Sequence, residues 1–377
     1  MLMISILTKF DNIARPFLLK FPSYIPTFIY SYSRKFFLKQ MYSSLPKKSI
    51  TLPSYVQRQF WGLNFQSNLF NAAGMFKDVW GYELSYRHGA GAFLCGTITP
   101  KPRKGNIKMG IKHPFIPLEK SKSAINWMGL PNIGIEIALQ RISKIEKRIG
   151  CPIGISISAQ PEDSEPKSIF ELIDALKMIE NSQVDFVELN ESCPNVNHSN
   201  SIEKFGNLAN NLVERLEIIS KSFLRKRNRN LPVVVKFSND TNPNQVDELV
   251  ELLVNLGFDG INFGNTSTNY SELRELIDKD ERKNFDFFTK NFGGGVSGLV
   301  LKDKSLNLCN KAIQKRNSLP LQREFVVIRT GGIQKWDELQ NSNIIGVNLN
   351  QWFTGYFENF SKYGHYIYAK MYEKVKV

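Results

Sequence analysis

The side chains best suited to chemistry lie in a short polar segment, Asn190-Glu191-Ser192-Cys193-Pro194-Asn195. The segment follows an apolar run at 184–188, and Pro194 lacks the N–H that a central strand needs, so we predict a turn at the end of a strand. The Asn190 and Asn195 amides can donate and accept hydrogen bonds, and the Cys193 thiol can act as a base or nucleophile. An ordinary polar loop with an incidental cysteine is the alternative interpretation.

The other cysteines and the histidines predict no metal or disulfide chemistry. Cys95, Cys151 and Cys309 lie far apart with no C-x-x-C motif, and the four histidines show no metal-ligand spacing. This pattern argues against a disulfide framework, a zinc site and an iron–sulfur cluster, and it favours a reducing compartment. We expect these three cysteines to be small buried apolar residues.

Lys236 and two glycine-rich segments are candidates for binding an anion. Lys236 lies in the apolar run 233–237, where a charge is costly unless it meets a carboxylate, a phosphate or a reduced flavin. A structural ion pair with a buried acid is the alternative. The segments 293–298 and Gly331-Gly332 would let backbone N–H groups approach a ligand closely, which suits a phosphorylated cofactor.

The elements that position these residues follow a regular alternation. Eight short apolar runs are separated mostly by helix-like segments such as 169–181, 208–224 and 243–256. Alternating strands and helices predict an α/β fold with a parallel sheet, and eight units predict a closed (β/α)₈ TIM barrel, here with a short helical N-terminal extension. The expected strands are 69–75, 91–98, 153–158, 186–190, 233–237, 260–265, 325–328 and 345–349.

Chemistry in such barrels lies at the C-terminal ends of the strands. Two long connections, 99–150 and 267–300, are expected to act as lids or binding loops. The first contains Asn126-Trp127-Met128-Gly129-Leu130-Pro131-Asn132. The residues at the expected strand ends are Lys77, Gly96, Thr97, Ser158, Asn190 with Cys193 and Asn195, Lys236, Asn265, Thr266, Gly331, Gly332, Phe353 and Thr354.

Composition indicates a basic globular protein. The 377 residues are 42% hydrophobic and 22% charged, and the net charge is +14. Lysines and arginines are dispersed and no nucleic-acid motif occurs, so we favour a membrane surface and anionic ligands over nucleic acid as partners. A merely basic, soluble surface is the alternative.

Residues 1–50 differ from the rest, which we assign to a barrel domain at 51–377. They hold eight basic residues against the single acid Asp11, interleaved with aromatic and aliphatic side chains. No apolar run reaches the roughly 18–20 residues of a spanning helix, and Pro16, Pro22 and Pro26 are expected to divide the segment into short helices. We predict an amphipathic extension lying on a membrane; a transit peptide and a helical cap on the core remain open.

Several of these motifs, in this order, resemble the dihydroorotate dehydrogenases, flavin enzymes of pyrimidine synthesis. The segment from Asn190 to Asn195 is similar to their catalytic loop, and Asn126 to Asn132 to their substrate loop. The resemblance extends from about Trp61 to Tyr356. Further matching segments are Ala72-Ala73-Gly74 with Lys77, residues 96–102, Gly105-Asn106, residues 295–298 and Gly331-Gly332-Ile333.

The resemblance implies FMN in the barrel with dihydroorotate stacked on it. Cys193 would be the base that removes the C5 proton, with hydride leaving C6 for flavin N5, and Lys236 would lie at the flavin N1–C2 edge. The substrate would contact Lys77, Asn126, Met128, Gly129, Leu130, Asn190, Asn195, Asn265 and Thr266. The cofactor would contact Ala73, Gly74, Thr97, Ser158, Asn190, Lys236, Gly295, Ser297, Gly298, Gly331, Gly332, Phe353 and Thr354.

The sequence combines features of two classes of this family. The N-terminal extension and Lys77 resemble the membrane-bound class that reduces a quinone, which implies peripheral attachment to the inner membrane of a bacterium or mitochondrion. Cys193 resembles the soluble class, since the quinone class normally uses serine. The family's Asn-Pro-x-Pro-Arg run is Asn106-Ile107-Lys108-Met109-Gly110 here, and Phe353 replaces a tyrosine. Fumarate or another soluble acceptor, and a non-catalytic barrel that binds a membrane or partner, are the alternatives.

Overall fold

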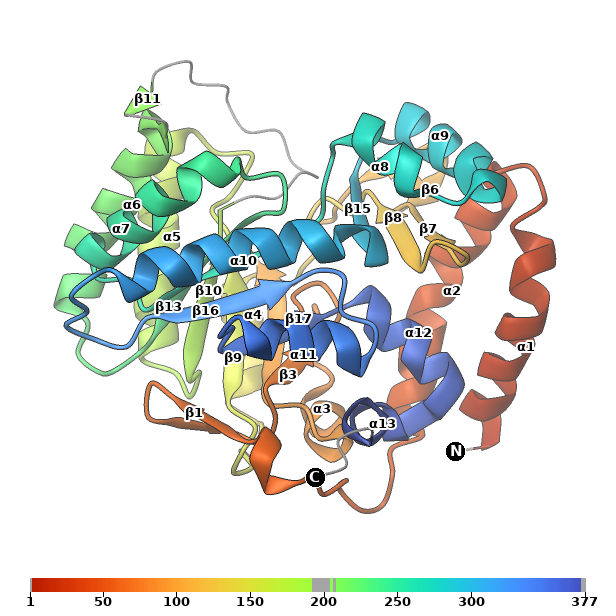
Figure 1. Cartoon of the computed structure of the whole chain (residues 1–377), viewed down its shortest axis with the longest axis horizontal. Helices are drawn as coiled ribbons and strands as arrows, with labels where there is room; N and C mark the ends of the chain where they lie inside the picture. Colours follow the sequence, from red (N-terminus) through yellow and green to blue (C-terminus); the bar gives the residue numbers. More distant parts are fainter. Residues whose placement is uncertain (1, 192–203, 206–207, 374–377) are drawn as a thin grey trace.

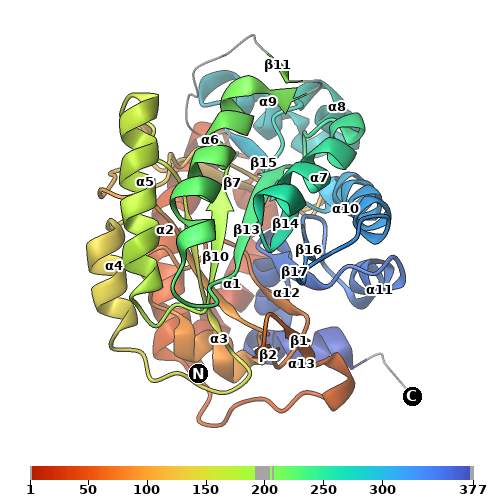
Figure 2. The ribbon, with the colours of Figure 1, turned by 90° about the vertical axis from the view of Figure 1, so that its left-hand side faces the viewer.

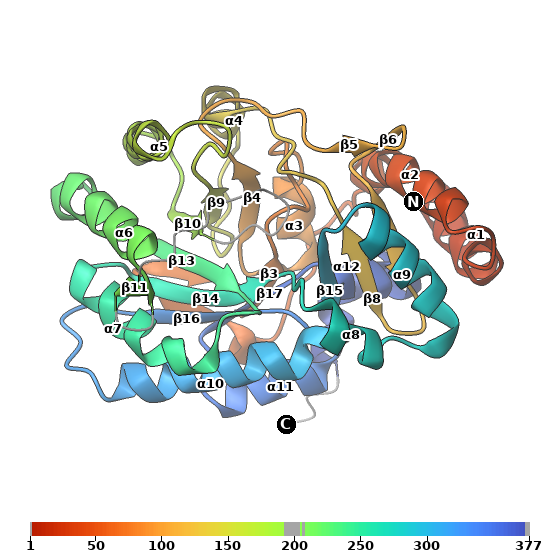
Figure 3. The same ribbon diagram turned by 90° about the horizontal axis from the view of Figure 1, so that it is seen from above.

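Eight parallel strands form the centre of the protein, as the alternation of the sequence predicted. The computed structural model describes residues 2–191, 204–205 and 208–373. Neighbouring strands follow the spatial order β3-β17-β16-β14-β13-β10-β9-β4, which is a nearly closed (β/α)₈ barrel (Figures 1 and 3). The strands are β3 (Leu69–Asn71), β4 (Phe93–Ile98), β9 (Ile153–Ile157), β10 (Phe186–Asn190), β13 (Val233–Ser238), β14 (Gly260–Asn265), β16 (Val326–Thr330) and β17 (Leu349–Trp352).

Helices cover the outside of the barrel. Helices α5, α6 and α7 lie side by side on one flank (Figure 2). Their inner faces carry leucine, isoleucine and valine at helical spacing, so the apolar side of each helix packs on the sheet. The helices are α3 (Tyr82–His88), α4 (Ile135–Ile142), α5 (Glu165–Glu180), α6 (Asn210–Ser222), α7 (Val246–Leu256), α10 (Lys302–Asn317), α11 (Trp336–Ile344), α12 (Thr354–Tyr363) and α13 (Ile367–Tyr372).

A side chain completes the barrel between β3 and β4. The Asn71 amide accepts a hydrogen bond from the Leu94 N–H at 3.2 Å and donates one to the Leu94 carbonyl at 2.7 Å. Asn71 is 1% exposed. Its amide therefore adds to the backbone hydrogen bonds from Gly91 to Leu69 and from Gly74 to Gly96 at the edge where the ladder of the barrel is incomplete.

The last strand begins four residues later than the sequence predicted. Residues 345–349 read as a strand, but the chain there finishes α11. Gly346 has a φ of 89°, and its N–H and that of Val347 donate to the carbonyls of Asn343 and Ser342 at 3.1 and 2.9 Å. This is a glycine-terminated helix end. The first apolar residues of the run therefore belong to the end of α11, and β17 begins only after them.

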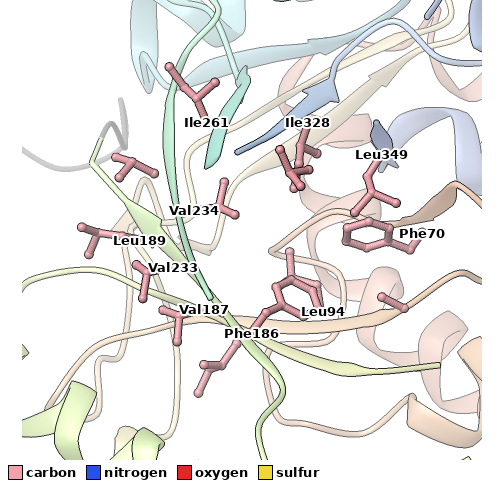
Figure 4. Packing of buried hydrophobic residues seen from close by; sticks show 14 of the residues in the cluster. Phe70, Leu94, Phe186, Val187, Leu189, Val233, Val234, Ile261, Ile328 and Leu349 are labelled. Carbon is pink, nitrogen blue, oxygen red and sulfur yellow. The ribbon is translucent and has the colours of Figure 1, made fainter. Parts of the chain in front are cut away.

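An aromatic cluster closes the N-terminal end of the barrel. A hairpin of β1 (Arg58–Phe60) and β2 (Leu63–Phe65) turns at Trp61, whose indole N–H donates to the Asp259 carbonyl at 3.1 Å. The ring of Phe186, at the start of β10, lies 6.0 Å from that of Trp61 and 6.1 Å from that of Phe70. Figure 4 shows Phe186 and Phe70 among the aliphatic side chains of the interior. The opposite end of the barrel is left for a site.

The two long connections meet in a small antiparallel sheet. Strand β8 (Ser123–Asn126) lies between β7 (Phe115–Leu118) and β15 (Gly295–Gly298), with Gly295 opposite Asn126. Its core is apolar and is formed with α8 (Tyr270–Leu276) and α9 (Arg282–Asn291), which contribute Leu273, Phe285 and Phe288. This sheet stands over the C-terminal side of the barrel (Figure 3).

Residues 1–50 fold mainly into two helices, α1 (Leu2–Leu18) and α2 (Tyr24–Ser43), beside the small sheet (Figure 1). Pro16 and Pro26 do not break them, contrary to expectation. Pro26 lies in the first turn of α2, where an N–H is dispensable. Pro16 lies in the last turn of α1, where its missing N–H removes one hydrogen bond close to the end of the helix. The Ser31 hydroxyl of α2 accepts from the Phe115 N–H at 2.9 Å. No helix in the described residues is long and apolar enough to cross a bilayer.

A chain of buried hydrogen bonds ties the N-terminal helices to the barrel. The Tyr356 hydroxyl lies 3.1 Å from His88 Nδ1, His88 Nε2 lies 2.7 Å from His365 Nδ1, and His365 Nε2 lies 3.0 Å from the Ser44 hydroxyl. The Ser44 hydroxyl donates onward to the Met41 carbonyl at 2.9 Å. Each of these contacts needs one donor and one acceptor. A protonated imidazole would donate from both of its nitrogens, so every contact is satisfied only when both imidazoles are neutral. Burial lowers the pKa of His88 well below its usual value and that of His365 to about 4.

These histidines predict a loss of stability in acid. An unfolded histidine binds a proton near pH 6.5, whereas the folded pair stays neutral, so the free energy of unfolding falls as pH drops from about 6.5 towards 4. The His365→Gln variant removes one titrating ring. Its urea unfolding midpoint should fall less between pH 7 and pH 5 than that of the unchanged protein. An equal fall in both proteins would contradict this account.

Candidate functional site

A cavity opens at the C-terminal ends of the barrel strands, between the barrel and the small sheet. Its walls come from β3, β4, β10, β13, β14, β16 and β17 and from the two long connections. The predicted residues that it brings together are Ala73, Gly74, Lys77, Thr97, Asn126, Met128, Leu130, Asn190, Lys236, Asn265, Thr266, Ser297, Gly298, Gly331, Gly332, Phe353 and Thr354.

One wall is a connected row of amides and hydroxyls. The Thr266 N–H donates to Asn265 Oδ1 at 3.0 Å, and Asn265 Nδ2 donates to Asn190 Oδ1 at 3.1 Å. Asn190 Nδ2 in turn donates to the Thr97 hydroxyl at 3.1 Å, which lies 3.0 Å from the Ser156 hydroxyl. These contacts fix which way each amide points. The Thr266 hydroxyl is buried without a hydrogen-bond partner among the described residues, so it can serve a ligand.

A second wall places two cations around a thioether. Lys77 Nζ lies 3.4 Å from Met128 Sδ, and Arg34 Nη1 of α2 lies 2.7 Å from the same sulfur. Burial lowers the pKa of Arg34 to about 10. Its Nε is buried and has no hydrogen-bond partner in the part of the chain that the structure describes. The buried Nε of Arg34 is therefore available to a polar group of a ligand.

Glycines and a helix N-terminus form the third wall. An added Cβ at Gly332 would lie 2.2 Å from Lys302 Cα, and one at Gly355 would lie 2.0 Å from the Ile333 carbonyl oxygen. Helix α12 starts here with no acidic residue in its first turn, and the Ser297 and Thr354 hydroxyls are 2.9 Å apart. Free backbone N–H groups and the positive end of a helix suit a phosphate.

Lys236 meets a buried acid, as the alternative interpretation of this residue held, and it also lines the cavity. Its Nζ lies 3.2 Å from Glu188 Oε1 and 3.3 Å from Gln351 Oε1. Lys236 is 4% exposed and Glu188 1%. The ion pair offsets the cost of burying the ammonium, and the position of the lysine still allows contact with a ligand.

Three predicted residues do not line the cavity. Gly129 has a φ of 68° and shapes the substrate-loop turn, where a Cβ would meet the Asn106 side chain. Gly295 pairs with Asn126 in the small sheet. Ser158 is buried just after β9, and Ser156 contacts Thr97 instead.

The predicted base lies outside the described residues, as does Asn195. The residue before this segment is held firmly: the Arg215 guanidinium of α6 binds Glu191 Oε2 at 2.6 Å and Glu165 Oε1 at 3.0 Å. The carboxylate of Glu191 raises the pKa of Arg215. Burial raises the pKa of the Cys95 and Cys309 thiols to about 12, so neither thiol is a base near neutral pH.

A second cavity of about 280 Å³ lies between α1, α2 and the barrel. Its lining is mainly apolar and includes Leu7, Leu18 and Ile29, with Arg34 as one of its few charged side chains. Phe353 and Thr354 line both cavities, so the two adjoin at the start of α12.

No cluster of potential metal ligands occurs within residues 2–191, 204–205 and 208–373.

The model of the family described as dihydroorotate dehydrogenase matches residues 55–374. The chain belongs to the dihydroorotate dehydrogenase family. Relatives named dihydroorotate dehydrogenase (quinone) include one from Halorhodospira halophila, 25% identical over 81% of this chain and 82% of its own. Another, from Christiangramia forsetii, is 27% identical over 92% of this chain and 94% of its own.

Solved structures support the fold. A DHODH from Eimeria tenella in complex with ferulenol superposes with a TM-score of 0.72 over 91% of this chain and 89% of that one, at 18% identity. Its ligand-free form gives a TM-score of 0.71. At this identity the likeness concerns the fold alone.

Sequence reasoning missed several cavity residues of this dihydroorotate dehydrogenase family member. Gln351, Trp352 and Gly355 were missed because the β17 run was placed four residues early. Thr330 precedes the Gly331-Gly332 pair and could have been found from that spacing. Arg34 lies in the N-terminal extension, and nothing in its sequence neighbourhood shows that it turns towards Met128. The remaining lining residues are Ala72, Gly264, Leu301 and Ile333.

The crowding at Gly332 predicts a strong effect of adding one methyl group. Gly332→Ala places a Cβ against the Lys302 backbone at a φ of 76°, which should cost about 1–3 kcal/mol of stability and close the phosphate end of the cavity. Gly62→Ala is the matched control, because Gly62 has a φ of 75° with open space around it. Urea unfolding and flavin content of the purified variants should separate the two. Equal losses in both would refute the crowding argument.

Proposed function

We propose that this protein oxidises dihydroorotate to orotate in pyrimidine biosynthesis, with FMN as cofactor and a quinone as electron acceptor. The observation that carries this proposal is the pairing of two adjoining cavities. One is lined by lysines, amides and glycines and the other by apolar side chains of the N-terminal helices. The relatives named dihydroorotate dehydrogenase (quinone) support the same reaction and acceptor.

The residues present fit FMN. The close approach at Gly332 and Gly355, with the N-terminus of α12, suits the phosphate. Lys236 would contact the edge of the flavin ring that gains negative charge on reduction. Ala73, Gly74 and Thr97 line the same cavity and are small enough to leave room for a flat ring. Bound FMN supplies the hydride acceptor that the protein side chains lack.

The protein side chains bind and deprotonate the substrate. Lys77 offers its ammonium to the substrate carboxylate, and the fixed amides of Asn126, Asn190 and Asn265 suit an imide-like ring. Cys193 accepts the proton from C5, since a free thiol with a pKa of about 8.5 is close enough to neutral pH to act as a base. The Arg215–Glu191 ion pair anchors the start of the segment that carries Cys193.

The apolar cavity suits a quinone ring, with Arg34 as the polar contact. The family arginine of the Asn-Pro-x-Pro-Arg run is absent here. Arg34 reaches from α2 to the Met128 sulfur at the border of the two cavities. Its buried Nε–H has no hydrogen-bond partner among the described residues, so it can donate to a quinone oxygen.

Residues 1–50 form a module that rests on a membrane, beside the FMN barrel of 51–377. The outward face of α1 presents Ile6, Phe10, Ile13 and Phe17, each 55–71% exposed and spaced three or four residues apart. Such a face inserts into the headgroup region of a bilayer and would place the apolar cavity beside the quinone pool. Flotation with anionic phospholipid vesicles, lost in Phe10→Ser/Phe17→Ser, tests this peripheral attachment to a bacterial or mitochondrial inner membrane.

Anaerobic dihydroorotate should bleach the flavin absorbance of the purified holoprotein. Cys193→Ala should slow this half-reaction by roughly 10²–10⁴-fold, because a general base contributes that much. Cys193→Ser should recover part of the rate with a pH profile shifted upward. A holoprotein that keeps FMN and never bleaches with dihydroorotate would refute the proposed function.

Arg34→Met should raise the KM for a soluble quinone about tenfold and leave the dihydroorotate half-reaction unchanged. Stopped-flow reoxidation with quinone and fumarate in parallel measures this. The control is Arg225→Met, an exposed arginine that lines neither cavity. Reoxidation by fumarate alone would instead point to a soluble acceptor.

A further inference from the structure

Five polar side chains from five neighbouring strands form a layer inside the barrel, directly under the cavity. Lys236, Thr330 and Gln351 line the cavity, whereas Glu188 and Asn262 lie behind them. The strands that carry them, β10, β13, β14, β16 and β17, follow one another around the barrel. All five residues are at most 8% exposed. We call this set the polar layer.

Glu188 is the centre of the polar layer. Its Oε1 accepts from Lys236 Nζ at 3.2 Å, and its Oε2 accepts from Asn262 Nδ2 at 2.8 Å and Gln351 Nε2 at 2.7 Å. Three donors and no acceptor face this carboxylate, which is the environment of an ionised group.

The remaining contacts of the layer fix the direction of both amides. The Thr330 hydroxyl lies 2.9 Å from Asn262 Oδ1 and 2.9 Å from Gln351 Oε1, and Lys236 Nζ also reaches Gln351 Oε1 at 3.3 Å. The amide oxygens therefore face the hydroxyl and the ammonium, and the amide NH₂ groups face Glu188. The carboxylate cannot turn away from Lys236 without leaving these donors unpaired.

The ammonium of Lys236 thus reaches the cavity with its charge already balanced from behind. A ligand that gains negative charge on the cavity side must share this lysine with Glu188. In a site shielded from water, the charge of Glu188 has a strong effect on the energy of a second negative charge on the other side of the lysine.

We propose that Glu188 is a positioning residue that sets the reduction potential of the bound flavin through Lys236. By neutralising part of the lysine charge, it makes the negatively charged reduced cofactor less stable and so favours passing the electrons on to the acceptor. This inference rests on the proposed function, in which FMN binds with its N1–C2 edge at Lys236.

The test is the midpoint potential of FMN in Glu188→Gln, measured by spectroelectrochemical titration. The variant keeps the size of the side chain and removes its charge, so the potential should rise by about 30 mV or more. That shift is a tenfold change in the equilibrium of a two-electron couple. Glu281→Gln is the matched control, because Glu281 is also buried but accepts from the Lys120 and Ser121 N–H groups and contacts no member of the polar layer. The flavin potential of this variant should stay unchanged.

A second variant separates the charge effect from loss of structure. Glu188→Asp keeps the charge and moves it one methylene away from Lys236, so its potential should lie between those of the unchanged protein and Glu188→Gln. Retained FMN with unchanged potentials in both variants would overturn this inference and leave the proposed function intact. An unchanged protein that binds no FMN would overturn the proposed function itself.

Discussion

The antiparallel pairing of β8 with β15 is the contact on which the site depends. It joins two connections that leave the barrel more than a hundred residues apart, and it places Asn126 opposite Gly295 at a defined register. Without it, the substrate-loop side chains and the glycines next to Thr354 would have no fixed relation to one another. Because β7 adjoins β8, the same small sheet also offers the surface on which α2 packs.

The N-terminal helices complete the site rather than merely covering it. Arg34 of α2 ends at the Met128 sulfur, and Arg15 of α1 forms an ion pair with Glu358 of α12 at 3.0 Å. Helix α12 begins at the boundary of the two cavities, so the docking of both helices is linked to the shape of the glycine-lined end of the first cavity. The hydrogen-bond chain through His88 and His365 reaches Ser44, directly after α2, and so attaches the C-terminal end of this helix to the barrel.

Polar groups at the mouth of the barrel are held in fixed orientations by one another. Each amide in the row from Thr266 to Thr97 is engaged at both ends, with its oxygen accepting and its NH₂ group donating, so its orientation is fixed before a ligand arrives. The side chains of the polar layer under them also hold one another in place. Two of these side chains are charged, and Lys236 and Glu188 are each too costly to bury alone. A site assembled in this way needs little rearrangement when an anionic substrate enters it.

The amino-acid sequence by itself determined the barrel, the order of its strands and most of the residues at their C-terminal ends. It could do so because apolar periodicity, glycine pairs and the spacing of amides are local properties of the chain. Only the tertiary structure decided that Asn71 completes the barrel, that β17 starts at Leu349, that Glu188 faces Lys236 and that Arg34 reaches Met128. Each of these depends on the stagger between strands or on the docking of a distant helix, which arises only when segments far apart in the sequence pack together.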